Sequence, residues 1–258
     1  MPGYTFEDLV NIMKRLRSSD GCAWDLEQTH ESIERNLIEE AYEVLDAIKN
    51  KDMHSLKEEL GDVLLQVVFH AQIACDDKAF DINDVIDTVS RKLINRHPHV
   101  FGASEADTPD KVIEQWERIK DVEKGNTNHT DKLMNVPRYF PALMRAYKVQ
   151  HRAAKAKFDW DDIKYVYEKI LEELEELKRE DFDKEDEMGD LLFAAVNLAR
   201  FLDIDPEIAL NRTTEKFISR FSHVEKRAGE NGNKLEDMRL DEMDVFWDEA
   251  KKMEKEGK

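Results

Sequence analysis

Two blocks of acidic residues recur in this sequence, and in each block the carboxylates stand three residues apart. Residues at that spacing lie on one face of a helix, because each residue turns the chain by about 100°. Two such pairs on neighbouring helices can together hold a divalent cation. The pairs are Glu40 with Glu43 and Glu59 with Asp62 in the first block, and Glu173 with Glu176 and Glu187 with Asp190 in the second.

The two blocks have the same phase relative to their apolar residues. Glu40 and Glu43 flank a stripe that contains Leu37 and Val44, and Glu173 flanks the equivalent stripe in the second block. Oxygen ligands alone suit Mg²⁺, or Mn²⁺, better than Zn²⁺. A solvated acidic helix face is the alternative for one block in a chain this rich in glutamate. Recurrence at a matching phase favours the metal site.

The composition indicates a globular, strongly acidic protein. Its 39 basic and 58 acidic residues give a formal net charge of -19, which repels nucleic-acid polymers and anionic membranes. No apolar run approaches the length of a membrane span, and the first residues lack the pattern of a signal peptide. We therefore expect a cytoplasmic protein. A small polyphosphate that arrives with its cation remains a suitable partner.

The spacing of apolar residues predicts an all-α fold with two duplicated helical domains. Periods near 3.6 residues dominate, and glycine and proline are scarce. We expect domains at 1–124 and 136–258, joined by a polar linker at 125–135. The predicted helices span 6–17, 30–50, 54–76, 82–96, 109–123, 139–156, 162–179, 184–202, 206–228 and 241–255.

Further residues repeat along with the acidic blocks. A Trp-Asp pair precedes each block, and a Lys/Arg pair and a Trp/Lys pair, each at i, i+4, follow it. Paired cations could neutralise phosphates and tryptophan could stack on a base, although surface ion pairs and core packing are the common roles of these residues. Trp160 could close over a ligand or act as a hydrophobic staple. The candidates are Trp160, Lys216, Arg220, Trp247 and Lys251, with Lys92, Arg96, Trp116 and Lys120 in the first half.

Taken together, these motifs resemble the MazG nucleoside triphosphate pyrophosphohydrolases in their long, two-domain form. The resemblance covers nearly the whole chain, including Gly21-Cys22-Ala23-Trp24-Asp25 and the run from Arg96 to Phe101. It implies an all-α homodimer that needs Mg²⁺ and hydrolyses nucleoside triphosphates to the monophosphate and pyrophosphate. It also implies that the carboxyl-terminal half is the main catalytic unit.

Carried over to this sequence, the resemblance assigns roles to individual residues. The metal ligands and catalytic residues are Glu173, Glu176, Glu187 and Asp190, with Glu40, Glu43, Glu59 and Asp62 as a possible second set. The nucleotide-binding residues are Lys216, Arg220, Trp247 and Lys251. We expect water to attack the phosphoanhydride beside the cation, with Glu176 or Glu187 as proton acceptor and Lys216 and Arg220 stabilising the leaving group.

Two alternatives belong to other functional classes. A nucleotide-sensing or partner-binding module would bind metal and ligand without turnover, and a helical scaffold would bind neither. The phase-matched acids with cations beside them favour the enzyme. Because stacking on tryptophan tolerates every base, and the sequence shows no residue set that reads one base edge, we expect broad base specificity.

Overall fold

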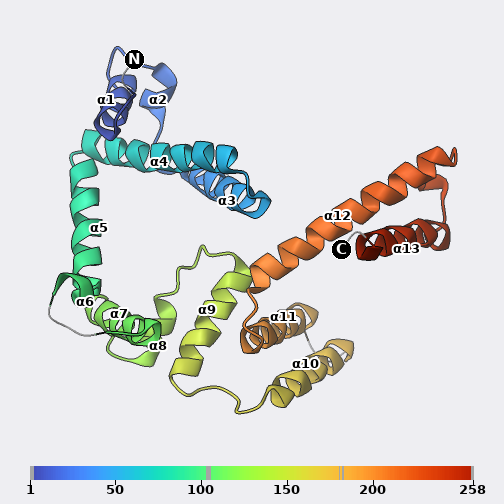
Figure 1. Ribbon diagram of the computed structural model, residues 1–258. Coiled ribbons are helices and arrows are strands. Elements are labelled where there is room, and N and C mark those ends of the chain that lie inside the picture. Colours follow the sequence, from blue (N-terminus) through green and yellow to red (C-terminus); the bar gives the residue numbers. More distant parts are fainter. Residues whose placement is uncertain (1–2, 103–105, 180, 182, 257–258) are drawn as a thin grey trace. The chain divides into compact units, whose positions relative to one another are not determined.

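The chain divides into two compact units, Met1–Val122 (unit 1) and Glu123–Lys258 (unit 2), in a computed structural model that describes residues 3–102, 106–179, 181 and 183–256. Every regular element in the described part of the chain is a helix, so the predicted all-α class is confirmed (Figure 1). None of the helices described there is long and apolar enough to cross a membrane.

The helices of unit 1 include the ones that carry the first acidic block. Helices α3 and α4 follow each other through a two-residue turn and pack side by side (Figure 1). Helix α3 ends at Lys51 in the left-handed conformation, and the side chain of Asp52 caps the first backbone N–H groups of α4. The unit comprises α1 Phe6–Leu16, α2 Ala23–Glu27, α3 Glu34–Asn50, α4 Met53–Asp76, α5 Ile82–Arg96, α6 Pro98–Phe101 and α7 Pro109–Glu123.

Unit 2 contains the same type of helix pair. Helices α10 and α11 pack against each other, α11 also packs against α9, and α12 pairs with α13. Asp162 and Asp183 cap α10 and α11, so aspartates set where both acidic helices begin. The elements are α8 His129–Met134, α9 Ala142–Lys155, α10 Ile163–Lys178, α11 Lys184–Phe201, α12 Pro206–Glu230, the 3₁₀ turn η1 Leu235–Asp237 and α13 Leu240–Glu256.

All ten predicted helices are present, with ends displaced by up to four residues. The short helices α2, α6 and α8 and the turn η1 were not predicted, because a single turn carries too little apolar periodicity to be recognised. Helix α8 lies inside the segment 125–135 that was predicted to be a linker, and it packs against α9. That part of the segment is therefore folded structure of unit 2.

The core of unit 1 is a cluster of five buried apolar side chains from α1, α4 and the turn before α3. Each contributes roughly 1.5–3 kcal/mol when fully buried. The members are Met13, Ile33, Val68, Phe69 and Ile73.

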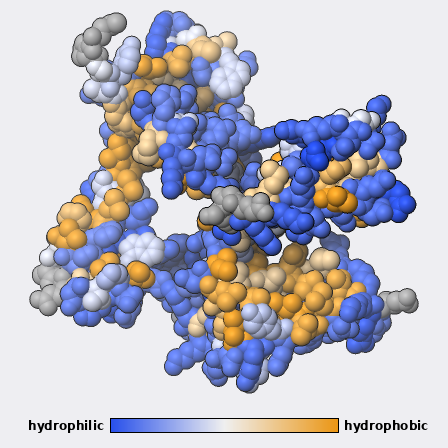
Figure 2. All heavy atoms as spheres, turned by 45° about the vertical axis from the view of Figure 1, so that its right-hand side comes forward, coloured by the Kyte–Doolittle hydropathy of each residue, from blue (hydrophilic) through white to orange (hydrophobic). Residues whose placement is uncertain are grey.

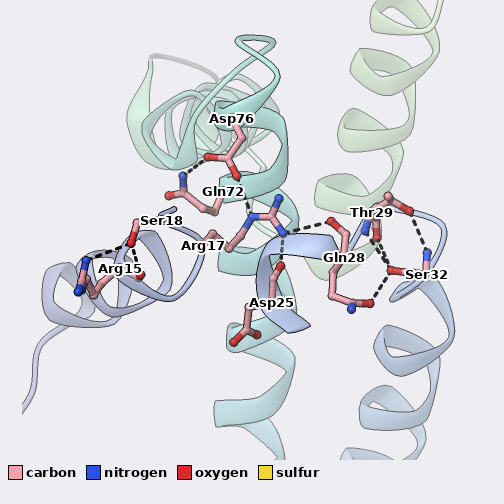
Figure 3. A network of polar contacts seen from close by, with 9 residues as sticks. All are labelled: Arg15, Arg17, Ser18, Asp25, Gln28, Thr29, Ser32, Gln72 and Asp76. Atoms are coloured by element: carbon pink, nitrogen blue, oxygen red, sulfur yellow. Dashed lines mark hydrogen bonds and ion pairs between the residues drawn. The ribbon is translucent and has the colours of Figure 1, made fainter. Parts of the chain in front are cut away.

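The buried side chain of Arg17 fixes the Trp24-Asp25 segment of unit 1 against α4. Its guanidinium donates to the backbone oxygens of Asp25 and Gln28 and forms an ion pair with Asp76, with Nε to Oδ2 at 2.8 Å (Figure 3). Gln72 donates to the other oxygen of Asp76 at 2.7 Å. The network ties the connection between α1 and α3 to the helix that carries Glu59.

Candidate functional site

Each pair of acidic helices brings three carboxylates together. In unit 2 one oxygen from each of Glu173, Glu176 and Glu187 lies within 4.8 Å of the other two. The same holds in unit 1 for the triplet formed by Glu40, Glu43 and Glu59. We call these groups the unit 2 cluster and the unit 1 cluster. The fourth predicted residues, Asp190 and Asp62, lie outside these triplets but close enough to act on the charges of Glu187 and Glu40.

The unit 2 cluster is the more buried of the two. Glu173 is 3% exposed and Glu187 is 7% exposed, and the Oε2 atom of each is buried without a hydrogen-bond partner. Burial raises the pKa of Glu187, and the charges of Glu176, Glu173 and Asp190 raise it further. Carboxylates in such a place are unstable as bare anions, because burial and mutual repulsion both oppose ionisation.

A divalent cation would remove this instability, and the residues present fit one. The unit 2 cluster offers oxygen donors alone, two of its buried oxygens lack any partner, and its like charges repel each other. Oxygen donors of this kind suit Mg²⁺ or Mn²⁺, which leave further coordination positions to water and phosphate.

The unit 1 cluster has a similar arrangement in a more open place. Glu43 is exposed, while Glu40 and Glu59 are half-buried. Partial burial raises the pKa of Glu40, with further contributions from Asp62 and Glu43, and partial burial together with Glu43 raises the pKa of Glu59. The unit 1 cluster therefore has the same carboxylate triplet as the unit 2 cluster, but its side chains are more exposed to solvent.

Lysine 169 pairs with the unit 2 cluster and was not predicted. Its Nζ lies 2.6 Å from Oε1 of Glu173, one turn further along α10, and 2.8 Å from Oε1 of Glu172. Hydrogen bonds to Glu172 and Glu173 raise the pKa of Lys169, which keeps it charged. The i, i+4 spacing of Lys169 and Glu173 was the available sequence signal. Unit 1 has Asn36 at the corresponding position, four residues before Glu40.

A cavity of 590 Å³ lies beside the unit 2 cluster. Glu173, Asp190 and Lys169 line one part of it, so the cavity adjoins the acidic site. Its apolar surface comes from α8, α9, α11 and the turn that contains Phe158 and Trp160. This volume is typical of small-molecule sites, which span about 300–1,000 Å³. The remaining lining residues are Leu133, Val149, Gln150, Ala153, Lys157, Asp159, Phe193, Ala194, Asn197 and Arg200.

Trp160 is therefore the predicted nucleotide-binding tryptophan that the structure places in this cavity. The alternative role of Trp160, as a hydrophobic staple, requires the position directly before the N-cap. The N-cap of α10 is Asp162, so that position is occupied by Asp161 and not by Trp160. Asp159, just before Trp160, forms an ion pair with Arg200 of α11. This ion pair holds the tryptophan turn to the helix that carries Glu187.

The predicted residues of α12 and α13 form a separate group. Arg220 makes two hydrogen bonds to Glu254, at 3.0 and 2.7 Å, and its guanidinium lies 5.6 Å from the ring centre of Trp247. Lys251 pairs with Asp248. In the part of the chain that the structure describes, no hydrogen bond or ion pair joins Lys216, Arg220 or Lys251 to the carboxylates of the unit 2 cluster. Their role in nucleotide binding stays a prediction.

The equivalent residues of unit 1 repeat part of this arrangement. The guanidinium of Arg96 lies 5.3 Å from the ring centre of Trp116, and Nζ of Lys120 lies 4.5 Å from it. An arginine thus contacts a tryptophan in both units, which supports the duplication inferred from the sequence. Among the residues that the structure describes, none forms a hydrogen bond, ion pair or ring contact with the side chain of Lys92.

Comparison with known proteins gives a consistent result. A family model described as the MazG nucleotide pyrophosphohydrolase domain matches residues 28–101 and 162–225. The chain is 50% identical over 251 residues to a Thermotoga maritima protein named nucleoside triphosphate pyrophosphohydrolase/pyrophosphatase MazG, with 96% of both chains covered. It is 45% identical over 254 residues to the Escherichia coli (strain K12) nucleoside triphosphate pyrophosphohydrolase, covering 95% of this chain and 97% of that one. Each match of the family model contains one carboxylate cluster.

Proposed function

The chain belongs to the MazG nucleotide pyrophosphohydrolase family, and we propose that it hydrolyses nucleoside triphosphates to the monophosphate and pyrophosphate with Mg²⁺ at the unit 2 cluster. The observation that carries this proposal is the cavity that adjoins Glu173 and Asp190. A substrate with its nucleoside in the cavity would present its phosphates to the carboxylates. Unit 1 would then serve mainly in assembly.

Glu173, Glu176, Glu187 and Asp190 would hold the cation. When bound, Mg²⁺, or Mn²⁺ in its place, neutralises phosphate charge and makes water at the site more acidic. Glu176 or Glu187 accepts the proton of the attacking water, since both belong to the triplet and Glu187 has a raised pKa. Lys169, which the sequence analysis did not predict, supplies a further positive charge at this site. When its ion pair with Glu173 opens, the ammonium group of Lys169 can bind a phosphate oxygen.

Lys216 and Arg220 take the charge of the departing pyrophosphate in this proposal, with Trp247 and Lys251 as further contacts. Support comes from their repetition in both halves, since Arg96 lies over Trp116 as Arg220 lies over Trp247. Binding requires Arg220 to exchange its hydrogen bonds to Glu254 for bonds to phosphate.

We further propose that the protein is a homodimer in the cytoplasm. Several apolar side chains of the acidic helices are exposed, and apolar groups lie among an otherwise hydrophilic surface (Figure 2). They include members of the stripes that the sequence predicts to face a helix. A second copy would cover them, as exposed apolar patches of this kind mark interfaces. The residues are Leu171, Leu174, Met188 and Leu192 in unit 2 and Ile48, Leu60 and Leu64 in unit 1.

The experiment that tests the reaction identifies its products. The protein is mixed with a nucleoside triphosphate and Mg²⁺, and phosphorus NMR follows the mixture. We expect equal amounts of monophosphate and pyrophosphate, and no reaction when EDTA removes the cation. Diphosphate and inorganic phosphate as products would refute the proposed bond cleavage. Binding of the triphosphate without any product would favour the nucleotide-sensing module.

A further inference from the structure

A partly buried arginine–glutamate pair joins α12 to α13 in unit 2. Nε and Nη2 of Arg220 donate to the two carboxylate oxygens of Glu254, at 3.0 and 2.7 Å. The side chain of Arg220 is 22% exposed and that of Glu254 is 36% exposed, so water screens the pair only in part. The forked guanidinium binds a phosphate group in the same two-pronged way as a carboxylate. Glu254 therefore occupies the nitrogens of Arg220 that a phosphate would use.

The ring of Trp247 holds the guanidinium of Arg220 in this place. The guanidinium carbon lies 5.6 Å from the ring centre of Trp247, and the ring centre of Phe217 lies 5.2 Å from the same point. A guanidinium over an aromatic face keeps the N–H groups of its own plane available for hydrogen bonds. The ring therefore fixes Arg220 and leaves its edge to an anion, which in this structure is the carboxylate of Glu254.

A second arginine–glutamate pair joins the same two helices and provides a comparison. Arg227 donates to Glu249 at 2.9 Å, and its guanidinium lies 5.5 Å from the ring centre of Phe246. At the positions of this ring and this acid, the first half of the sequence has Gln115 and Arg118. The pair at Arg227 therefore holds α12 to α13 without belonging to the duplicated motif.

The first pair does belong to the duplicated motif. In the first half of the sequence, Arg96 lies 5.3 Å from the ring centre of Trp116, and Glu123 follows this tryptophan by seven residues. Glu254 follows Trp247 at the same distance along the chain. The acid thus recurs together with the arginine and the tryptophan that the sequence assigns to nucleotide binding, which a role in helix packing alone does not require.

We infer that Glu254 is a built-in competitor of the pyrophosphate product, which takes back Arg220 after hydrolysis and so weakens the binding of pyrophosphate. This inference rests on the proposed function, in which Arg220 takes the charge of the departing pyrophosphate. Pyrophosphate binds Arg220 only in the fraction of molecules whose arginine has left Glu254, so its apparent dissociation constant is raised by the inverse of that fraction. The exchange replaces one ion pair by another, so the product leaves without an unpaired charge remaining in a partly buried place.

Isothermal titration calorimetry with pyrophosphate and Mg²⁺ tests this inference without requiring turnover. Glu254→Gln keeps the size of the side chain and removes its charge, and we expect the dissociation constant of pyrophosphate to fall about tenfold. The matched control is Glu249→Gln, which weakens the comparison pair of the same two helices and should leave that constant within about twofold of the intact protein. The gain should depend on Arg220, so Arg220→Met and Arg220→Met/Glu254→Gln should bind pyrophosphate equally.

Three outcomes for Glu254→Gln would overturn the inference. They are an unchanged dissociation constant, a gain that Glu249→Gln shares, and weaker binding, which would mean that Glu254 positions Arg220 for the phosphate. Undetectable binding in both the intact protein and Glu254→Gln would overturn it as well. Absence of pyrophosphate release from nucleoside triphosphates by the intact protein would instead refute the proposed function, so the two failures are distinguishable.

A second variant decides if Glu254→Gln does not fold, as judged by circular dichroism. Glu254→Asp keeps the charge, but its side chain is one methylene shorter and holds Arg220 less well. We expect pyrophosphate to bind this variant about threefold more tightly than the intact protein. Unchanged or weaker binding by Glu254→Asp would overturn the inference.

Discussion

The two units contain the same carboxylate triplet but differ in what surrounds it. Eight residues after Gly61, unit 1 has Phe69, whereas eight residues after Gly189, unit 2 has Asn197. Phe69 is buried in the apolar core of unit 1, and Asn197 lines the cavity of unit 2. If unit 2 alone is catalytic, as we propose, the triplet itself does not account for the difference, because both units have one. The difference is whether the space beside it holds core or is open to a ligand.

The units also differ in how they hold their Trp-Asp segment to the second acidic helix. In unit 1, Arg17 of the α1 C-terminus binds the backbone of Asp25 and the side chain of Asp76 (Figure 3). In unit 2, Arg200 of α11 binds Asp159 and also orients Asn197. An arginine thus stabilises this connection in both units. Arg200 of unit 2 also lines the cavity.

Transferring the unit 1 residue into unit 2 tests whether the cavity beside the unit 2 cluster is used. In Asn197→Phe a phenyl ring would occupy the cavity and remove a donor. We expect kcat/KM for nucleoside triphosphates to fall about a hundredfold, which corresponds to roughly 3 kcal/mol of lost transition-state binding. Steady-state pyrophosphate release measures this. The control is Ile208→Phe, an exposed position on α12, where activity should stay within about twofold of the intact protein. Full activity of Asn197→Phe would show that the cavity is not used.

The reverse transfer tests the structural role of unit 1. In Phe69→Asn a buried ring of the core cluster is replaced by a smaller amide without an obvious partner. We expect the free energy of unfolding to fall by about 3 kcal/mol, from the lost apolar burial and the cavity left behind. Urea denaturation followed by circular dichroism gives this value. A change below about 1 kcal/mol would contradict the place of Phe69 in the core.

The burial of the unit 2 cluster makes the stability of the folded protein depend on pH. The pKa of Glu187 is raised, so in the metal-free protein the folded state loses stability relative to the unfolded state as pH rises above about 4.5 and Glu187 ionises. Glu187→Gln removes that charge and should raise the melting temperature in EDTA at pH 7 by a few degrees. The difference should vanish at acid pH, where both side chains are neutral. Glu185→Gln, on the exposed part of the same helix, is the control and should not change the melting temperature.

Lys169 gives the smallest expected effect. Its ion pair with Glu173 competes with a divalent cation for the same carboxylate. We expect Lys169→Met to bind Mn²⁺ about three to ten times more tightly in the absence of nucleotide, because one opposing positive charge is removed. Titration followed by electron paramagnetic resonance measures free Mn²⁺. Weaker Mn²⁺ binding by the variant would show that Lys169 positions Glu173 and does not compete for it.

The sequence allowed the helix class, the ten long helices and two sets of four carboxylates to be predicted, because each depends on periodicity along a single helix. The structure groups three carboxylates of each set. Carboxylates at i, i+3 necessarily share a face, and duplication supplied the second observation that a single motif lacks. The position of Asn197 was not recognised, because a buried amide within an apolar helix gives no periodic signal. The available signal was the alignment of the two halves, in which the polar Asn197 stands opposite the apolar Phe69.

Other features depend on contacts between distant segments. The cavity is formed by α8, α9, α10, α11 and the turn at Trp160, and no spacing within one helix reveals that these meet. The short helix α8 occupies a segment whose polar composition is typical of a linker. Arg220 and Lys251 were assigned by their place in the repeat, and the structure gives them partners in Glu254 and Asp248 that the sequence could not indicate.

We propose that the unit 2 cluster is the catalytic centre of the protein and that the unit 1 cluster is not. The most direct test compares pyrophosphate release, with Mg²⁺, by Glu187→Gln and by Glu59→Gln, which change equivalent residues of the two clusters in the same way. We predict that kcat falls at least about a thousandfold in Glu187→Gln and less than tenfold in Glu59→Gln. Equal losses in the two variants, or a larger loss in Glu59→Gln, would contradict the claim.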